Sequence, residues 1–195
     1  MVLAMRSFGR VWLCDCDSPW TLWKGDVWSM HCSQHPLDPY SFTHFSHGLI
    51  FYVALLWLTR GIDKWLRRST GLLSEANPCS PNSTTFPMLW RFFTAIFLAS
   101  AWEVAENSTW IIERYRTVTM SLEYMGDSVL NAVADVVCCG TGFWVARRIG
   151  VMWSLAILLV IELALLFFTR DNLTLNVLML ISPVDAVKQW QMGVK

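Results

Sequence analysis

Four apolar stretches constrain the fold of this chain more than any other feature of its sequence. They run over residues 40–58, 86–105, 127–146 and 151–169, and the last contains a single charged residue, Glu162. A transmembrane helix needs about 20 consecutive, mostly apolar residues, and each stretch approaches that length. The sequence therefore predicts an all-α integral membrane protein, a bundle of four transmembrane helices.

The composition agrees with a membrane protein. Hydrophobic residues make up 54% of the chain and charged residues 15%, against about 25% charged residues in soluble domains. With 12 Trp and 11 Phe, the chain is too apolar for a disordered protein. The formal net charge is zero, which leaves no basic footprint for nucleic acid. We therefore expect the lipid bilayer as a partner and no nucleic acid.

The length fits a single polytopic membrane domain with three parts. Residues 1–39 form an N-terminal segment on the outer side, 40–169 the four-helix core, and 170–195 an interfacial tail. Residues 1–13 are too short for a span and lack the layout of a signal peptide. The linker 59–85 is polar and contains two prolines, so we expect a loop there.

The tail could hold a fifth transmembrane helix or shorter elements. Residues 172–181 would cover only about 15 Å as a helix, and Pro183 follows them. Val184, Val187 and Trp190 then recur at helical spacing. We expect a short membrane-dipping segment followed by an interfacial helix.

Basic residues in short loops set the orientation of membrane helices, because Lys and Arg are enriched on the cytoplasmic side. One side of the expected bundle carries Arg60, Lys64, Arg67, Arg68, Arg147 and Arg148. The other side carries Arg114, Arg116 and Arg170 near helix ends. This excess places the first set in the cytoplasm. The chain is then a multi-pass protein of the bacterial inner (cytoplasmic) membrane.

With this topology, polar residues of four helices meet in the outer half of the membrane, facing the periplasm. His44 and His47 are three residues apart and so share one helix face, as do Glu103 and Glu106. The ligand-binding candidates are His44, His47, Glu103, Glu106, Asn107, Arg114, Arg116, Asp127, Asn131, Asp135 and Glu162. Such residues are rare inside membranes, and the default interpretation of an intramembrane ionisable group is functional.

The cost of burying a charge limits the protonation states and partners that the carboxylates of this cluster can have. A lone charge at the centre of a transmembrane helix costs about 2.5–3.5 kcal/mol. Asp135 and Glu162 must therefore be protonated, paired, bound to a metal, or exposed to a wet cavity. Arg114 and Arg116 are the candidate partners at the outer surface.

Two interpretations of the cluster stay open. In the functional one, a divalent metal ion is a candidate cofactor, with ligands drawn from His44, His47, Glu103, Glu106 and Asp127. Imidazole with carboxylate suits zinc or iron, and carboxylate-rich sets suit magnesium or manganese. In the structural one, the polar groups only hydrogen-bond one helix to another. No nucleophilic triad, phosphate loop or HExxH helix is present, so no catalytic residue is predicted.

The N-terminal segment holds three disulfide candidates, Cys14, Cys16 and Cys32. On the outer side a disulfide such as Cys14–Cys32 is one interpretation. Metal binding by these cysteines with His31 or His35 is one alternative, although the spacing matches no zinc motif. Free thiols are the other.

Several motifs resemble one family. They are SQHPLDPYSFTHFSHGLIFY from Ser33, WEVAENSTWIIERYR from Trp102, GDSVLNAVAD from Gly126 and LNVLMLISPVDAVKQWQ from Leu175. These segments resemble an uncharacterised family of proteobacterial inner-membrane proteins, a domain of unknown function. The resemblance implies a fold and a location but no activity. It also implies an additional transmembrane helix before the Gly9-Arg10 and Cys14-to-Cys16 region.

A looser pattern is similar to VanZ-like membrane proteins, which are associated with glycopeptide resistance. It consists of a His, an acidic residue, an Arg, and Asp-x-x-x-Asn, matched here by His47, Glu103 or Glu106, Arg114 or Arg116, and Asp127 with Asn131. The similarity implies an outward-facing role in the envelope or with lipids.

Three functions are compatible with these observations. The first is a membrane protein of unknown activity that binds a ligand, a metal or a lipid headgroup in the outer half of the bilayer. The second is a metal-dependent membrane hydrolase or transferase acting on an envelope lipid. The third is a structural or accessory subunit with membrane-protein partners. A transporter is disfavoured, because four helices without an inverted repeat leave little room for alternating access.

Overall fold

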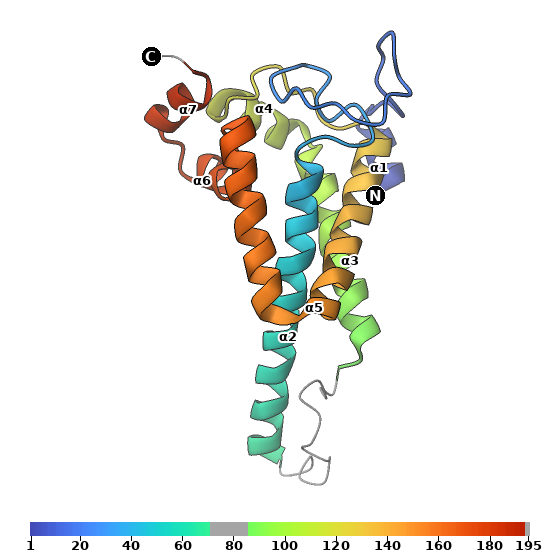
Figure 1. Ribbon diagram of the computed structural model, residues 1–195. Helices are drawn as coiled ribbons and strands as arrows, with labels where there is room; N and C mark the ends of the chain where they lie inside the picture. The colour runs from blue at the N-terminus through green and yellow to red at the C-terminus, as the bar shows by residue number, and fades with distance from the viewer. Residues whose placement is uncertain (71–85, 194–195) are drawn as a thin grey trace.

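A computed structural model describes residues 1–70 and 86–193, and this part of the chain is helical with no strand (Figure 1). The helices are α1 Val2–Ser7, α2 Ser41–Thr70, α3 Met88–Glu106, α4 Thr109–Val118, α5 Val129–Thr169, α6 Leu173–Ile181 and α7 Asp185–Gln191. Within the described residues, α2, α3 and α5 are long and apolar enough to cross a membrane. The predicted all-α fold class is confirmed.

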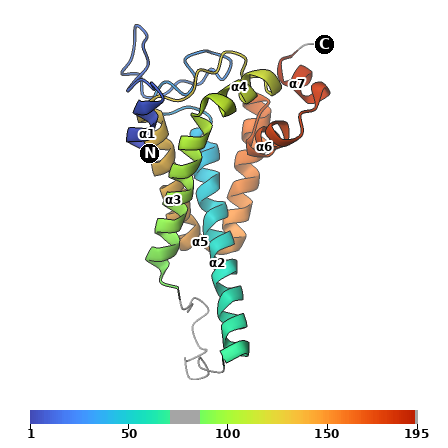
Figure 2. The same cartoon turned by 180° about the vertical axis from the view of Figure 1, so that it is seen from behind.

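Helix α5 contains two of the four expected apolar helices. Its 41 residues are interrupted at Gly150, where φ is 81° and ψ is 175°. Only glycine adopts such a conformation without strain. Figures 1 and 2 show that the ribbon doubles back at this point, so the halves 129–149 and 151–169 run antiparallel. The expected loop after 146 is a turn at one residue, and Arg147 and Arg148 are helical.

Helix α2 is longer than the sequence suggested. We expected a loop from 59, but the helix continues to Thr70, giving 30 residues and a length of about 45 Å. The expectation rested on polarity, whereas the residues from Arg60 to Arg68 contain no proline and so nothing that stops a helix. The hydrocarbon core of a bilayer is about 30 Å thick, and in Figure 1 the last turns of α2 project beyond the reversal of α5.

Two glycines allow α2 and α5 to touch backbone to backbone. A Cβ atom at Gly48 would lie 2.6 Å from the Phe143 amide nitrogen and would overlap the Cys139 carbonyl. A Cβ atom at Gly142 would overlap the Phe45 carbonyl. Small residues at such contacts are typical of helices that pack closely in membranes. This contact fixes the register of α2 against the first half of α5. Because Gly48 lies against Cys139, His44, one turn earlier in α2, lies near Asp135, one turn earlier in α5.

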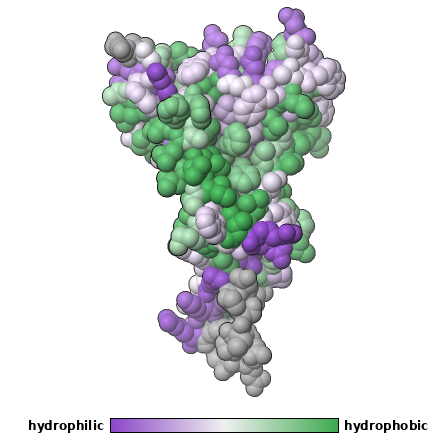
Figure 3. Space-filling model, in the orientation of Figure 1, coloured by the Kyte–Doolittle hydropathy of each residue, from purple (hydrophilic) through white to green (hydrophobic). Residues whose placement is uncertain are grey.

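The remaining helices gather at one end of the bundle. Figures 1 and 2 show α4, α6, α7 and the N-terminal loops at the end where α2 begins and α5 both begins and ends. Helix α6 has nine residues, or about 13.5 Å, which is too short to cross a membrane. The prediction of short C-terminal helices is confirmed. Figure 3 shows apolar side chains over the middle of the molecule and more polar ones toward its ends.

Candidate functional site

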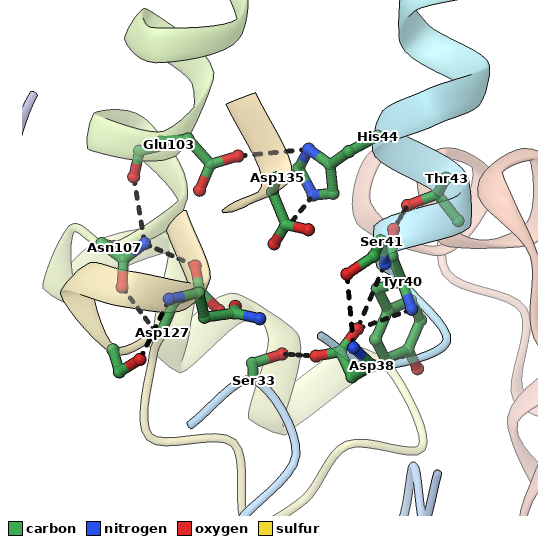
Figure 4. A network of polar contacts seen from close by, with 12 residues as sticks. Ser33, Asp38, Tyr40, Ser41, Thr43, His44, Glu103, Asn107, Asp127 and Asp135 are labelled. Atoms are coloured by element: carbon green, nitrogen blue, oxygen red, sulfur yellow. Dashed lines mark hydrogen bonds and ion pairs between the residues drawn. The ribbon is translucent and has the colours of Figure 1, made fainter. Parts of the chain in front are cut away.

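Three buried side chains from three helices meet beside the loops at this end (Figure 4). His44 lies in the first turn of α2, Glu103 in the last turn of α3 and Asp135 in the second turn of α5. His44 Nδ1 is 3.1 Å from Glu103 Oε1, and His44 Nε2 is 3.9 Å from Asp135 Oδ2. The sequence-based expectation that these helices bring polar residues to one layer agrees with this geometry.

One oxygen of each carboxylate in this group lacks a hydrogen-bond donor. Glu103 is 0% and Asp135 is 3% exposed. Among the described residues, neither Glu103 Oε2 nor Asp135 Oδ1 has a hydrogen-bond partner. Nearly all buried polar groups in proteins are hydrogen-bonded, and burying an unpaired charge is costly. These oxygens therefore call for a proton or a cation.

Glu106, one turn after Glu103 (just before α4), extends the group. One ligand atom each from His44, Glu103 and Glu106 lies within 4.8 Å of the other two. Tyr115 and Trp102 hydrogen-bond to Glu106. One imidazole with two carboxylates is a donor set that suits divalent transition metals.

His47 lies beside this group rather than within it. Its ring is perpendicular to that of His44, with the two centroids 5.4 Å apart, and it stacks on Phe51 at 6.0 Å. Like His44, it faces a cavity of about 340 Å³, a volume at the lower end of ligand pockets. His47 was predicted as a metal ligand, but it lies next to the group of His44, Glu103 and Glu106 and is not part of it.

Asp127 supports the group from the start of α5. Its backbone N–H donates to Asn107 Oδ1 at 2.7 Å, and Asn107 Nδ2 donates to Asp127 Oδ2 at 2.6 Å. The Tyr124 hydroxyl donates to Asp127 Oδ1 at 2.9 Å. Burial raises the pKa of Asp127 to about 6, and the hydrogen bonds from Asn107 and Tyr124 oppose this rise. Because both carboxylate oxygens already accept hydrogen bonds, Asp127 joins α3 to α5 instead of offering a vacant ligand atom.

Asp38 is a buried residue that the sequence analysis missed. It accepts hydrogen bonds from the backbone N–H groups of Tyr40 at 2.7 Å and Ser41 at 3.2 Å, and from the Ser33 hydroxyl at 3.0 Å. It thereby caps the start of α2 and holds the 33–38 loop above His44. Burial raises the pKa of Asp38. The signal was an Asp just ahead of a long apolar helix, which is a typical N-terminal cap.

The cavity is lined by both polar and apolar side chains, among them His44, Glu106 and Asp127, and Phe51, Leu98 and Val177. Along α2 and α3 the two kinds are about two turns apart, because Phe51 follows His44 by seven residues and Leu98 precedes Glu106 by eight. The apolar residues come from α2, α3 and α6. A space with this division suits an amphipathic molecule, whose polar part would lie against the buried carboxylates.

Glu162 and Arg114 hold α6, one wall of this cavity, instead of joining the cluster. Glu162 Oε1 and Oε2 accept from the backbone N–H groups of Leu173 and Thr174, each at 3.0 Å. Arg114 donates from Nε and Nη2 to the Leu180 carbonyl, at 3.1 and 3.0 Å. A carboxylate at the first turn and a cation at the last turn both stabilise a helix. The intramembrane carboxylate that we assigned to the site thus caps a helix.

Arg116 and Asn131 also bind backbone carbonyls. Arg116 donates to Leu122 O at 3.3 Å, and Asn131 Nδ2 donates to His35 O at 2.9 Å. Arg114 and Arg116 were the expected partners of the buried carboxylates, but these contacts direct both guanidinium groups to the chain backbone.

Replacing Glu162 with alanine is expected to loosen α6. The variant loses the two Glu162 oxygens that accept from the N–H groups of Leu173 and Thr174, and loss of a helix cap costs about 1 kcal/mol. Backbone amides of 173–181 should then exchange hydrogen for deuterium about fivefold faster, which corresponds to that free energy. Mass spectrometry of the detergent-solubilised protein measures the rate. Glu113→Ala, at an exposed position of α4, is the control, and equal exchange in the two variants would contradict the capping role.

The N-terminal cysteines do not form the Cys14–Cys32 disulfide that the sequence analysis gave as an example. Cys14 forms a disulfide with Cys16, and Cys32 is a free thiol. Cys32 is buried with Val27 and Met120, and its Sγ lies 3.9 Å from Asp38 Oδ2. Burial raises the pKa of the Cys32 thiol. A Cys14–Cys32 bond is therefore excluded in this structure, because the turn before α2 directs Cys32 into the interior.

Comparison with known proteins identifies relatives along nearly the whole chain. Residues 5–193 match the family described as Protein of unknown function (DUF2585). A UPF0314 protein of Rhizobium meliloti is 42% identical over 193 residues, which cover 99% of this chain and 85% of the relative. A UPF0314 protein of Paracoccus denitrificans is 43% identical over 183 residues, covering 94% and 82%.

No solved structure matches the chain. The comparisons give no support to the similarity with VanZ-like proteins, whereas the resemblance to an uncharacterised proteobacterial family is confirmed. With its family match and these relatives, the chain belongs to the DUF2585 family, whose function is unknown.

Proposed function

We propose that this protein binds a divalent metal ion with His44, Glu103 and Glu106, and that the ion holds the polar head of an amphipathic ligand in the adjoining cavity. One observation carries the proposal: the ligand atoms of these residues lie within 4.8 Å of one another, and Glu103 Oε2 is buried without a hydrogen-bond donor. Helix–helix hydrogen bonding alone would leave this oxygen unsatisfied, whereas a cation would neutralise both carboxylates.

We further propose that α2, α3 and both halves of α5 cross the bacterial inner membrane. The last turns of α2, which include Lys64, and the reversal of α5, which follows Arg147 and Arg148, lie on the side of the molecule away from the short helices and N-terminal loops that line the cavity. Basic residues favour the cytoplasmic side, so the cavity lies in the outer half and faces the periplasm.

A second function is a metal-dependent hydrolase or transferase acting on an envelope lipid. The separation of polar and apolar residues in the cavity favours it, because an acyl chain beside Phe51, Leu98 and Val177 would place a headgroup near His44 and Glu106, the two proposed ligands that line the cavity. A bound ion can polarise a phosphoryl or carbonyl oxygen and can lower the pKa of a bound water. Asp135, with Oδ2 3.9 Å from His44 Nε2, and His47, whose ring centroid is 5.4 Å from that of His44, are the groups beside the three ligands that could move a proton.

Metal analysis tests the proposed function. The protein, purified in detergent with its disulfide intact, is stripped with a chelator, dialysed against Mn²⁺, desalted and analysed by mass spectrometry of its metal content. Manganese is the probe because carboxylate and imidazole bind it, while thiols do not favour it. We expect about one Mn²⁺ per chain at saturation. The proposal is overturned if the wild-type protein retains no manganese, and also retains no metal when it is reloaded with Zn²⁺ or Fe²⁺ instead.

The proposed topology predicts a specific labelling pattern. Cysteine placed at Lys64, an exposed position of α2, should react with an impermeant maleimide only after the inner membrane is opened. Cysteine placed at Glu113, an exposed position of α4, should react in intact spheroplasts. The unsubstituted protein gives the background from its own thiols. The reverse pattern would place the cavity on the cytoplasmic side.

A further inference from the structure

A second group of metal-ligand side chains lies in the N-terminal loops, apart from the central cavity. Cys14 Sγ is 3.3 Å from His31 Nδ1, and Cys16 Sγ is 3.8 Å from His35 Nε2. Ligand atoms of Cys14, Cys16 and His31 all lie within 4.8 Å of one another. Each of the two cysteines thus faces its own histidine.

The two sulfur–nitrogen separations fit a tetrahedral zinc site, in which Cys14, Cys16 and His31 are already close together and His35, beside Cys16, must move in as the fourth ligand. With Zn–S of about 2.3 Å and Zn–N of about 2.0–2.1 Å, neighbouring sulfur and nitrogen ligands lie about 3.5 Å apart. The two observed sulfur–nitrogen distances, 3.3 and 3.8 Å, bracket this value. The histidines are four residues apart, within the range of zinc sites, while the cysteine pair is one residue closer than the usual spacing.

His35 is oriented as a metal ligand would be. It is 3% exposed, and its Nδ1 lies 3.0 Å from the Thr21 carbonyl. A carbonyl only accepts hydrogen bonds, so Nδ1 carries the proton, and Nε2 presents a lone pair toward Cys16. Metal-bound histidines almost always donate their other ring N–H to a carbonyl or carboxylate in this way.

We propose that reduction of the Cys14–Cys16 disulfide creates a zinc site made of the two cysteine thiolates and the His31 and His35 imidazoles. A dithiol or phosphine reductant supplies two electrons, and with two protons these break the Sγ–Sγ bond to give two thiols. Zinc then binds and displaces both protons as the thiolates form. In the oxidised protein each sulfur is committed to the disulfide, so the site exists only in the reduced state.

The site links redox state to the loops above the cavity. The His35 carbonyl accepts a hydrogen bond from Asn131 of α5 at 2.9 Å, and Ser33 bonds to Asp38 at the start of α2. Zinc would therefore fix residues 14–35 against α2 and α5, two of the three helices that carry the central cluster. This inference does not depend on the proposed function of that cluster.

Cobalt is the spectroscopic probe for the test, because Co²⁺ takes tetrahedral zinc sites and gives an intense near-ultraviolet charge-transfer band only with thiolate ligands. The full-length protein in detergent is titrated with Co²⁺ before and after reduction by a phosphine. We expect the band only in the reduced protein, with a plateau at one Co²⁺ per chain beyond what the oxidised protein binds, and loss of the band on adding Zn²⁺. Glu103→Gln should keep the band, because the central cluster contains no thiol.

Variants assign the ligands. Cys16→Ser should lose the band, and His31→Ala, at a half-buried position, should weaken Co²⁺ binding about tenfold or more. Cys138→Ser, in α5, is the matched control and should bind as the wild type does. Far-ultraviolet circular dichroism verifies that each variant keeps its helices. The proposal is overturned if the reduced wild type gives no band, or if the band survives unchanged in Cys16→Ser or His31→Ala.

Discussion

Glu103→Gln is expected to lose bound manganese, with affinity reduced by at least about 100-fold. Loss of residues that only support a ligand already costs 10–100-fold in metal affinity, and Glu103 would be a direct ligand. The glutamine is nearly the same size, so the packing of α3 against α2 and α5 is preserved. Equilibrium dialysis with Mn²⁺, read by mass spectrometry, measures the change.

The stability of the same variant separates a metal site from simple hydrogen bonding between helices. Without metal, Glu103→Gln removes a buried carboxylate oxygen that has no donor, so it should melt no lower than the metal-free wild type. Bound metal stabilises only the wild type, by mass action. Glu113→Gln, an exposed position on α4, is the control for both measurements. The metal-site proposal is contradicted if the variant keeps its manganese, or if it melts far below the metal-free wild type.

Gly48→Ala, which adds a single methyl group, is expected to lower the stability of the bundle strongly. The new Cβ atom would meet the backbone at Cys139 and Phe143, and backbone atoms cannot move aside as a side chain can. Overpacking costs about 1–3 kcal/mol even where side chains can shift, so we expect at least about 3 kcal/mol here. Thermal melting in detergent, followed by circular dichroism, measures the effect.

Gly61 of α2 supplies the matched control for this substitution. A Cβ atom there would meet nothing within 4 Å, and alanine favours a helix over glycine by about 1 kcal/mol. Gly61→Ala should therefore melt slightly above the wild type. Equal melting of Gly48→Ala and the wild type would mean that α2 and α5 do not touch as described. Because the contact sets the register that places His44 opposite Asp135, Gly48→Ala should also weaken manganese binding.

The core helices were predictable from the length of their apolar stretches. The two halves of α5 were expected as separate helices, and Gly150 permits the turn between them. The extension of α2 past Arg60 was missed, because polarity predicts an aqueous environment and not the end of a helix. Only a proline or a capping residue would have marked that end.

The candidate site was predictable where depth and helical spacing decide position. His44, Glu103 and Asp135 stand near the same end of their helices, so sequence numbers place them in one layer. The same argument placed Glu162 in that layer, but depth does not say which way a side chain points. Its partners are backbone N–H groups eleven and twelve residues further on. Asp38 was missed because it lies in a loop with no periodic pattern.

The turn at Gly150 has a consequence for how the protein is made. On the proposed topology, a single residue joins two membrane-crossing segments, so no loop exists that could stay outside while one segment inserts. Both halves of α5 must enter the bilayer together as a hairpin, with Arg147 and Arg148 retained on the side of synthesis. Any other residue at this position, where φ is 81°, would strain the reversal. Gly150 thus governs biogenesis of the protein as well as its final shape.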